Sequence, residues 1–456
     1  MKNYKEFFKN KKVTVVGLGL LGKGLSDTKF LAECGADIIV TDLKTREQLK
    51  SSVDALKGYK NITFSLGGHK LKDFENKDFI LKGQGVPLDS IYIKHARKNG
   101  IPVEMDEALF IKLVKDLNLD LNIIGVTGTR GKSTTTFLIY EILKLNDNRV
   151  HISGNMLGTT VLPLLKKVKN GDTVVFELSS WQLQGFGEDK ISPHISVFTN
   201  FMPDHLNYYG STTLTTRQAM QRYFKDKAYI YTSQTKDDFL VLGESMKKLV
   251  KGNKSKTLIA KSADVPKSWK IKLLGEHNKQ NIMCAVEVAR ILNIKESIIK
   301  KVVESFGGVP GRLELVREVR GVKIYNDTNA TTPEATIAAL NSFKNNASPK
   351  SDLGQSKVIL IMGGMDKGID VKNLNKILAK KTKKVFLTPG SGSDKIDERP
   401  AFVYKVENLK EAVEKAYKEA KKEDIILFSP GFASFNMFKN EYDRGEQFMK
   451  IVKKLK

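Results

Sequence analysis

The sequence predicts an α/β protein of three domains that are built on parallel sheets. The 456 residues suit about three domains of roughly 150 residues each. Short β-branched or aromatic runs alternate with helical patterns along the chain. Many of these runs end in Gly, Ser, Asn or Asp, which is typical of parallel strands that bind ligands at their carboxyl ends.

Nine runs have the composition of strands that are buried on both faces. They lie at residues 12–19, 36–42, 78–83, 122–128, 173–180, 195–201, 357–364, 383–390 and 424–431. Residues 105–120 lead from one α/β unit to the next, and Gly and Pro cluster at residues 306–316. We therefore expect domains at residues 1–108, 109–308 and 309–456.

The composition favours a cytoplasmic protein without a nucleic-acid or membrane partner. The formal charge is +25, but only 12 of the 76 basic residues are Arg, and the lysines are spread along the chain without a basic tail. This pattern indicates a solvated surface rather than a nucleic-acid site. No apolar run is long enough for a signal peptide or a membrane span. Cys34 and Cys284 are expected to be core thiols in a reducing compartment.

The first glycine motif follows the strand at residues 12–19. Gly17, Gly19 and Gly22 have the spacing of a dinucleotide fingerprint, and Asp42 closes the next strand 20 residues after Gly22. The motif fits a nicotinamide dehydrogenase, a site for a mononucleotide diphosphate, or only a tight turn between a strand and a helix. Taken alone, it does not choose among them.

A second glycine-rich stretch, "GVTGTRGKSTTT", lies between an apolar run and a helical pattern, which is how proteins hold phosphate. The common nucleotide loop would need a glycine at the position of Val126, whereas the glycines stand at 125, 128 and 131. Lys132 is expected to neutralise a β- or γ-phosphate. Ser133 or Thr134 is expected to contact Mg²⁺.

Two strand ends in the same predicted domain offer further metal ligands. Glu177 ends a buried strand, where its carboxylate could reach a metal ion at the phosphate loop or simply pair with a lysine. Asp204 and His205 follow the next apolar run, and both residue types bind metals. A single histidine is more often structural, but this one stands beside an aspartate at a strand end.

The last third of the chain contains weaker motifs. His277, Asn278 and Asn281 occupy the first turns of a predicted helix, as caps or as contacts to a base. Asp327 follows a strand, and Lys367 follows a Gly-Gly turn. Ser434 is expected near the start of a helix that follows the strand at 424–431, and such turns suit a carboxylate substrate.

Taken together, the motifs resemble the Mur ligase family, and within it the members of the MurD type. "TGTRGKSTTT", "ELSSWQL", "PDHLNYYGS", "GEHNKQN", "PGRLE", "NDTNATTPEAT", "GGMDKG" and "SPGFASFNMFKN" occur in the family's order over nearly the whole chain. The resemblance implies an N-terminal Rossmann-like UDP-binding domain, a central sheet like that of P-loop ATPases, and a C-terminal Rossmann-like domain. It implies an ATP-dependent ligase, acting as a monomer, that adds D-glutamate to UDP-N-acetylmuramoyl-L-alanine through an acyl phosphate in peptidoglycan precursor synthesis.

The resemblance also implies roles for individual residues. ATP would contact Gly128, Thr129, Gly131, Lys132, Ser133, Thr134, Asn278, Asn281, Arg312 and Asp327. Two Mg²⁺ ions would be held by Ser133, Glu177, His205 and Lys227, the last as a carbamylated lysine. The two other substrates would contact Gly19, Leu20, Leu21, Asp42, Asn155, Ser179, Gln182, Lys367, Ser434 and Phe435. The residues expected to act in catalysis are Lys132, Lys227, His205 and Lys367.

Three departures from the family pattern keep alternatives open. Asn329 stands where many D-glutamate ligases have Lys, and Glu441 stands where Phe is usual. Gly83 and Gln84 replace a Ser-Pro pair in a loop of the UDP site. The first two departures leave a sibling that adds L-glutamate as a rival hypothesis. A folate-polyglutamate ligase is a rival from the same family. The phosphate loop and the charge of +25 leave a nucleic-acid-binding ATPase open, and the first glycine motif leaves a nicotinamide dehydrogenase open.

Overall fold

The computed structural model describes most of the chain in two compact units. The described residues are 3–19, 22–147, 149–156, 159–209, 215–273, 275–343, 356–366, 369–397, 400–434 and 437–455. One unit comprises Met1–Lys267 and Lys279–Val302, and the other comprises Ser268–Asn278 and Val303–Lys456. Because the two units are separate bodies, each is described by itself.

The first sheet of the first unit is a five-stranded parallel sheet. Its strand order is β3-β2-β1-β4-β5. The strands are β1 Lys12–Val16, β2 Asp37–Asp42, β3 Ile62–Leu66, β4 Phe79–Lys82 and β5 Val103–Glu104. The helices are α1 Tyr4–Phe8, α2 Lys23–Glu33, α3 Lys50–Leu56 and α4 Ile91–Lys98. The strand order reverses between β1 and β4, and such a switch point is where ligands bind in doubly wound sheets.

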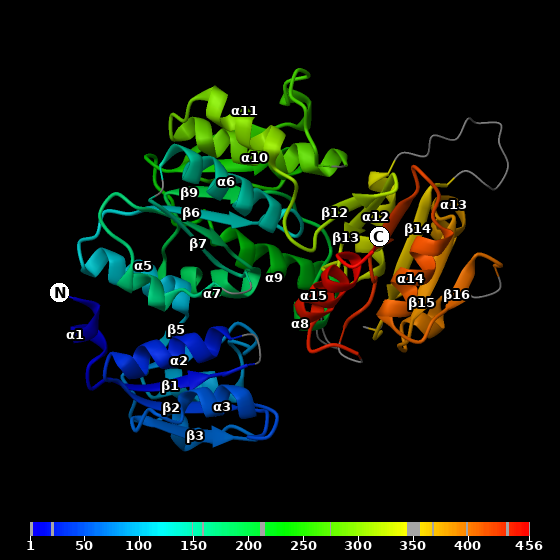
Figure 1. Ribbon diagram of the computed structural model, residues 1–456. Coiled ribbons are helices and arrows are strands. Elements are labelled where there is room, and N and C mark those ends of the chain that lie inside the picture. The colour runs from blue at the N-terminus through cyan, green and yellow to red at the C-terminus, as the bar shows by residue number, and fades with distance from the viewer. Residues whose placement is uncertain are drawn as a thin grey trace. The chain divides into compact units, whose positions relative to one another are not determined.

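The second sheet of this unit has six parallel strands in the order β11-β10-β9-β6-β8-β7. They are β6 Asn122–Thr127, β7 Val150–Gly154, β8 Thr173–Glu177, β9 Ile195–Phe198, β10 Phe239–Gly243 and β11 Lys256–Ala260. The helices are α5 Asp106–Asp116, α6 Lys132–Asn146, α7 Ser180–Asp189, α8 Leu206–Tyr209, α9 Thr216–Ala228, α10 Glu276–Ile291 and α11 Glu296–Ser305. Figure 1 shows α6 and α10 on one face of the sheet and α7 and α9 on the other. β6 lies between β8 and β9, so the loops after these three strands share one edge.

The second unit contains a six-stranded sheet in the order β12-β13-β17-β14-β15-β16. The strands are β12 Glu314–Val319, β13 Val322–Asn326, β14 Val358–Gly363, β15 Lys384–Thr388, β16 Val403–Lys405 and β17 Ile425–Phe428. The helices are α12 Pro333–Ser342, α13 Lys372–Lys381, α14 Leu409–Glu419 and α15 Glu441–Val452. Hydrophobic clusters cover both faces, as expected for a sheet whose strands are almost all parallel.

The α/β fold with three sheets confirms the predicted fold class, and all nine predicted strands are present. Some of the missed strands are very short, since β5 has two residues and β16 has three. β10, with five largely buried residues, was also missed. The edge strand β12 pairs antiparallel with β13, a departure from an all-parallel sheet. The predicted domain boundaries stay a prediction. No helix within the described parts of the chain is long and apolar enough to span a membrane.

The prediction that Ser434 stands near the start of a helix is wrong. Helix α15 begins at Glu441, where the side chain of Asn440 accepts hydrogen bonds from the backbone N–H groups of Tyr442 and Asp443. This cap favours a helix start at that position. Ser434 therefore lies in the loop that follows β17.

Candidate functional site

The loop after β6 is shaped by two glycines and by the end of the neighbouring strand β9. Gly128 (φ 148°) and Gly131 (φ 81°) hold backbone conformations that L side chains rarely adopt. A Cβ atom at Gly128 would collide with the Thr199 hydroxyl. Asn200 accepts a hydrogen bond from Arg130 N (2.9 Å) and donates one to Arg130 O (3.0 Å). The strand end therefore fixes the shape of the loop.

The position of Gly125 explains why the glycine spacing departs from the common nucleotide loop. Gly125 lies inside β6, where a Cβ atom would come within 2.6 Å of Pro193 Cγ and 3.1 Å of Leu178 Cδ1. It is a packing residue of the sheet. Gly128 and Gly131 are the glycines that belong to the loop itself.

Helix α6 begins at Lys132, directly after the left-handed Gly131. Lys132 Nζ donates to the carbonyl oxygens of Gly128 (3.1 Å) and Thr129 (3.2 Å). Ser133 is buried and Thr134 is partly exposed in the first turn. The N-terminus of a long helix carries partial positive charge and free N–H groups, so this loop and its lysine suit a phosphate.

Lys227 reaches the same loop from α9. Its side chain is buried, and Nζ donates to Gly128 O (2.9 Å) and lies 3.5 Å from Thr127 Oγ1. Nζ also lies over the Tyr223 ring, 4.9 Å from its centroid. Burial, reinforced by the charge of Lys132, holds the pKa of Lys227 well below its ordinary value. An uncharged amine is therefore favoured at this position.

Glu177, at the end of β8, is 2% exposed. Its Oε1 accepts a hydrogen bond from Asn155 Nδ2 (3.2 Å), and its Oε2 is buried without a hydrogen-bond partner among the described residues. A buried carboxylate oxygen without a partner is costly, and a cation would compensate it. This observation supports the predicted metal role for Glu177.

His205 lies in the loop after β9, between two aromatic rings. Its ring centroid is 4.7 Å from Trp181 and 5.8 Å from Tyr223. Nε2 lies 3.7 Å from Asp204 Oδ2, which accepts a hydrogen bond from Arg130 Nη1 (3.2 Å). Burial lowers the pKa of His205, which favours the neutral imidazole that binds metals.

The donor set around this loop fits Mg²⁺ bound together with phosphate. Among the described residues, no group of three or more His, Cys, Asp or Glu side chains could hold a metal ion. Mg²⁺, however, is usually bound by one or two carboxylates, a hydroxyl group and the oxygens of the substrate phosphates. Ser133 and Glu177 supply the first two. Lys227 would become a ligand only if its amine were converted to an anionic group.

The glycine loop of the first sheet is held by Asp42. Asp42 Oδ2 accepts a hydrogen bond from Gly19 N (3.0 Å), and Oδ1 accepts one from Lys44 N (2.9 Å). Both carboxylate oxygens therefore contribute to the shape of the turns at this edge. Leu20 and Leu21 lie outside the described residues.

A buried lysine at the end of β4 shapes the adjacent loop, and it was missed in the sequence. Lys82 is 2% exposed and donates to Val86 O (2.8 Å) and Gly83 O (3.3 Å). Burial lowers the pKa of Lys82 to about 8. Gly83 and Gln84, which differ from the family pattern, therefore lie in a loop whose backbone carbonyl groups are held by the buried Lys82 side chain.

In the second unit, Asp327 and Ser434 follow β13 and β17, which pair in the sheet. Asp327 accepts hydrogen bonds from Leu313 N (3.0 Å) and Ser429 Oγ (2.8 Å). Burial raises the pKa of Asp327 to about 7, and the nearby charge of Arg312 opposes this rise. Ser434 is 2% exposed, and its hydroxyl has no hydrogen-bond partner within the described part of the chain. Lys367 and Phe435 lie outside the described residues.

Arg444 ties these two loops together, and sequence reasoning missed it. Its buried guanidinium donates to Thr328 O (2.8 Å) and to Phe432 O (3.1 Å). One side chain therefore holds the loop after β13 and the loop after β17. Asn329 donates to Pro310 O (3.4 Å), and Glu441 accepts from Thr328 Oγ1 through its backbone carbonyl (2.8 Å).

The two asparagines predicted at the adenine belong to different units. Asn278 is 8% exposed in the second unit, and Asn281 is 3% exposed in the first. A Cβ atom at Gly131 would collide with the Asn281 amide, so Asn281 packs directly against the phosphate loop. His277, the residue before Asn278, is exposed, and partial desolvation lowers its pKa.

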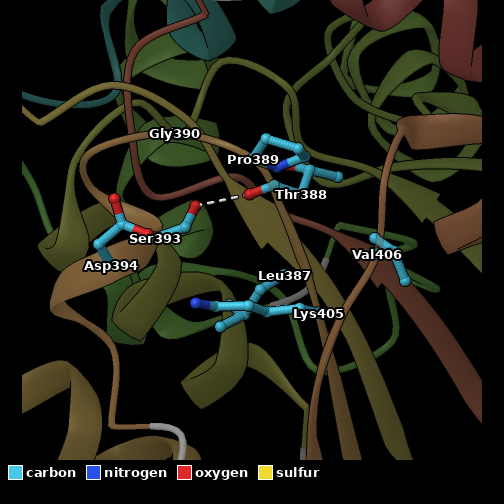
Figure 2. Close-up of a pocket in the computed structure, with 8 residues that line it drawn as sticks. All are labelled: Leu387, Thr388, Pro389, Gly390, Ser393, Asp394, Lys405 and Val406. Atoms are coloured by element: carbon cyan, nitrogen blue, oxygen red, sulfur yellow. Dashed lines mark hydrogen bonds between the residues drawn. The ribbon is translucent and has the colours of Figure 1, made fainter.

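The described structure also contains a cavity of about 180 Å³ at the carboxyl end of β15 (Figure 2). It is lined by Leu387, Thr388, Pro389, Gly390, Ser393, Asp394, Lys405 and Val406. Figure 2 shows the hydrogen bond from Ser393 Oγ to Thr388 O (2.7 Å) at its rim. None of the predicted site residues that the structure describes is among the residues that line this cavity.

Known domain families match three parts of the chain. The N-terminal domain of MurD-like Mur ligases matches residues 11–104. The Mur ligase middle domain matches residues 126–264, and the Mur ligase glutamate ligase domain matches residues 311–432.

Full-length relatives are also similar. The UDP-N-acetylmuramoylalanine–D-glutamate ligase of Roseiflexus sp. is 34% identical, with 97% of this chain and 98% of the relative covered. The ligase of the same name from Acetivibrio thermocellus is 34% identical, with 99% and 98% covered.

Solved structures share the fold at low sequence identity. The chain matches the MurF ligase of Thermotoga maritima in complex with ADP with a TM-score of 0.59 and 19% identity, covering 100% of this chain and 96% of that one. It matches UDP-N-acetylmuramate-alanine ligase of the same organism with a TM-score of 0.58 and 20% identity, covering 97% and 99%.

Proposed function

Because the chain belongs to the Mur ligase family, we propose that it is an ATP-dependent ligase that joins D-glutamate to UDP-N-acetylmuramoyl-L-alanine. The names and the nearly complete coverage of the full-length relatives support this substrate pair. The observation that supports the chemistry most directly is the convergence of Lys132 and Lys227 on Gly128 O beside a phosphate loop. The product would enter peptidoglycan synthesis, which serves cell-wall growth, cell shape and cell division.

The reaction needs an activated carboxylate, because a carboxylate oxygen is a poor leaving group at neutral pH. The L-alanyl carboxylate attacks the γ-phosphorus of ATP, the bond from that phosphorus to the β–γ bridging oxygen breaks, and ADP leaves. The amine of glutamate then attacks the acyl phosphate, and inorganic phosphate departs as the amide forms. Such a transfer depends on positioning and on neutralising charge.

Lys132 and the first turn of α6 provide that neutralisation in this proposal. The Nζ of Lys132 lies at the loop that would surround the β- and γ-phosphates, and Ser133 and Thr134 follow in the first helical turn. Arg312 and Asp327 of the second unit would contact the γ-phosphate and the ribose. Asn278 and Asn281 would contact the adenine.

Two Mg²⁺ ions complete the proposed site. Ser133 and Glu177 would hold one ion, while His205 and a carbamylated Lys227 would hold the other. The buried Oε2 of Glu177, which has no partner among the described residues, and the lowered pKa of His205 support these ligands. The ions would shield the negative charge of the phosphates. The lowered pKa of Lys227 supports carbamylation, because only an uncharged amine reacts with CO₂.

The remaining predicted residues would bind the other two substrates. The uridine diphosphate would lie at the glycine loop of the first sheet, near Gly19, Leu20, Leu21 and Asp42, and Asn155 would be a further contact to it. Glutamate would contact Lys367, Ser434 and Phe435. The Ser434 hydroxyl, buried without a partner in the described part of the chain, supports this assignment. We propose a monomer in the cytoplasm, where the free and buried Cys34 and Cys284 would stay reduced.

Release of inorganic phosphate from ATP tests the proposal. The purified protein is given UDP-N-acetylmuramoyl-L-alanine and Mg²⁺, together with D-glutamate or L-glutamate in parallel samples. The proposal expects release that requires the UDP substrate and is faster with D-glutamate. Faster release with L-glutamate would favour the sibling reaction that Asn329 and Glu441 keep open, and no release with either would contradict the ligase assignment.

A further inference from the structure

A cluster of buried charges joins three helices of the first unit. Lys23, the first residue of α2, places Nζ 2.9 Å from Asp106 Oδ2 and 2.5 Å from Glu107 Oε1 at the start of α5. The Glu107 side chain is 0% exposed, and that of Asp106 is 7% exposed. Asp27 of α2 faces the same carboxylates. The cluster thus gathers three carboxyl groups around one ammonium group.

Glu107 also holds a side chain of α7. Its Oε1 accepts a hydrogen bond from Gln182 Nε2, and Gln182 Oε1 accepts one from Ser179 N (2.8 Å). The Gln182 backbone N–H in turn donates to Ser179 Oγ (3.3 Å), which completes a capping box. Gln182 is fully buried, with both ends of its amide paired inside the protein. Glu177 stands two residues before Ser179, at the end of β8.

The other end of the cluster leads into the glycine loop of the first sheet. Lys23 follows Gly22, whose left-handed backbone (φ 86°) starts α2. Gly24 packs so closely that a Cβ atom there would come within 2.6 Å of the carbonyl oxygens of Gly17 and Leu18. The start of α2 is therefore fixed against the loop. A continuous chain of contacts runs from this loop through Lys23, Glu107 and Gln182 to the Glu177 strand end.

The energetics of buried charges indicate that this cluster fixes the relative positions of the helices more than it stabilises the folded state. A buried ion pair gives little net stability, because desolvation of the charges offsets their attraction. A well-packed apolar cluster of similar volume would hold the helices together at least as well. Directional hydrogen bonds fix relative positions more narrowly than apolar contacts do.

We propose that Glu107 is a positioning residue of the ligase reaction: it sets the glycine loop of the first sheet at a fixed place relative to the Glu177–Ser179 strand end. The inference rests on the proposed function, in which the UDP group occupies that loop and the phosphoryl transfer occurs beside Glu177. Glu107 then determines where the substrate carboxylate stands relative to the γ-phosphate. Gln182 was predicted to contact a substrate. In this proposal it instead connects Glu107 to Ser179 by hydrogen bonds and so helps to position the strand end.

The experiment compares two variants of the cluster with a matched control. Glu107→Gln keeps the shape and one acceptor for Gln182 but replaces the carboxyl group that pairs with Lys23, and Lys23→Met removes that partner. The control, Lys112→Met, lies on the same helix and joins Glu104 (2.5 Å) and Asp189 at the far end of α7 (2.9 Å). For each protein we would measure kcat and the KM for ATP by phosphate release, the Kd for UDP by calorimetry, and the thermal midpoint.

The expected result separates positioning from folding. In Glu107→Gln and Lys23→Met, kcat falls about 10- to 100-fold, because small misplacement of reacting groups has effects of this size. The KM for ATP and the Kd for UDP change less than about threefold, because each binding loop stays intact. Lys112→Met keeps the kcat of the parent protein.

Three outcomes would overturn the inference. A kcat within twofold of the parent in both cluster variants means that the link does not set the reaction geometry. An equal loss in Lys112→Met means that any ion pair at α5 has the same effect. Failure of both cluster variants to fold means that the cluster serves folding. A parent protein without turnover contradicts the proposed function itself, which is a different result from these three.

Discussion

At the scale of residues, the carbonyl oxygen of Gly128 brings two lysine side chains together at the phosphate loop. Gly128 O accepts hydrogen bonds from both Lys132 and Lys227, so two amino groups are held near one acceptor. Their mutual repulsion adds to burial in lowering the pKa of Lys227. The positive charge at this loop therefore comes from Lys132, and it suits the negative charge of nucleotide phosphates.

The Lys132→Ala variant is expected to lose ATP turnover while keeping the UDP substrate. Removing the cation leaves the developing phosphate charge without its compensation, so ADP formation should fall on the order of 10²–10³-fold or more. The Kd for the UDP substrate should stay within about threefold, because the glycine loop of the first sheet is untouched. Lys144→Ala, on the last turn of the same helix, is the matched control and should retain turnover. Unchanged turnover in Lys132→Ala would contradict the assignment.

Asp327 makes stability depend on pH. Its pKa rises from an ordinary 3.8 to about 7 in the folded state, so the folded state binds more protons between these values. The contribution of Asp327 to stability is therefore full below about pH 4 and is lost as the pH rises to about 7. The positive charge of Arg312 opposes the rise in the pKa of Asp327. The pKa nevertheless stays above its ordinary value, so the direction of the pH dependence is unchanged.

The Asp327→Asn variant should remove this dependence. Its thermal midpoint, measured relative to the parent protein, should be lowest near pH 4–5 and should rise toward pH 8. A difference that stays constant between pH 5 and pH 8 would mean that Asp327 does not titrate with a raised pKa.

At the scale of elements, the turn between β6 and α6 depends on one left-handed residue. Gly131→Ala introduces a strained backbone at φ 81° and a collision with Asn281, so it should destabilise the protein by about 1–3 kcal/mol and weaken ATP binding. Gly58→Ala is the control, because no described atom lies within 4 Å of the place that its new Cβ atom would take, and its φ is not positive. Equal thermal midpoints for the two variants would contradict this account of the loop.

The nine predicted strands all lie inside their sheets, whereas the edge strands and the interior strand β10 were missed. β6, β8 and β14 are apolar runs because both faces are covered, so composition alone reveals them. The edge strands β12 and β16 consist mostly of exposed and half-buried residues and resemble loops. The misplaced helix start at Ser434 has a similar cause, because the cap that starts α15 is Asn440, several residues later.

The candidate site was predictable to the extent that it follows strand ends. Lys132 and His205 follow β6 and β9, and Glu177 is the last residue of β8; these three strands are neighbours in the sheet. Their partners were not predictable, since the contacts of Asn200 with the phosphate loop and of Glu107 with Gln182 join segments far apart in the sequence. Local patterns contain no signal for such pairs.

At the scale of the whole molecule, the net charge of +25 comes mainly from Lys. The described ion pairs are largely at the surface, where they contribute little stability and remain solvated. ATP turnover should therefore stay within about twofold when single-stranded DNA or RNA is added at 150 mM salt. A stimulation of tenfold or more would favour the rival hypothesis of a nucleic-acid-binding ATPase.

The division into two compact units agrees with a reaction that brings several substrates together. Predicted ATP contacts lie in both units: Lys132 and Asn281 are in the first, and Arg312 and Asp327 are in the second.

The most direct test of the central claim is phosphate release with UDP-N-acetylmuramoyl-L-alanine, ATP and Mg²⁺, in the presence of D-glutamate or L-glutamate. The account predicts release that depends on both the UDP substrate and the amino acid, with D-glutamate preferred, and an amide product of matching mass. Release that needs neither substrate, or no release with either form of glutamate, would contradict it.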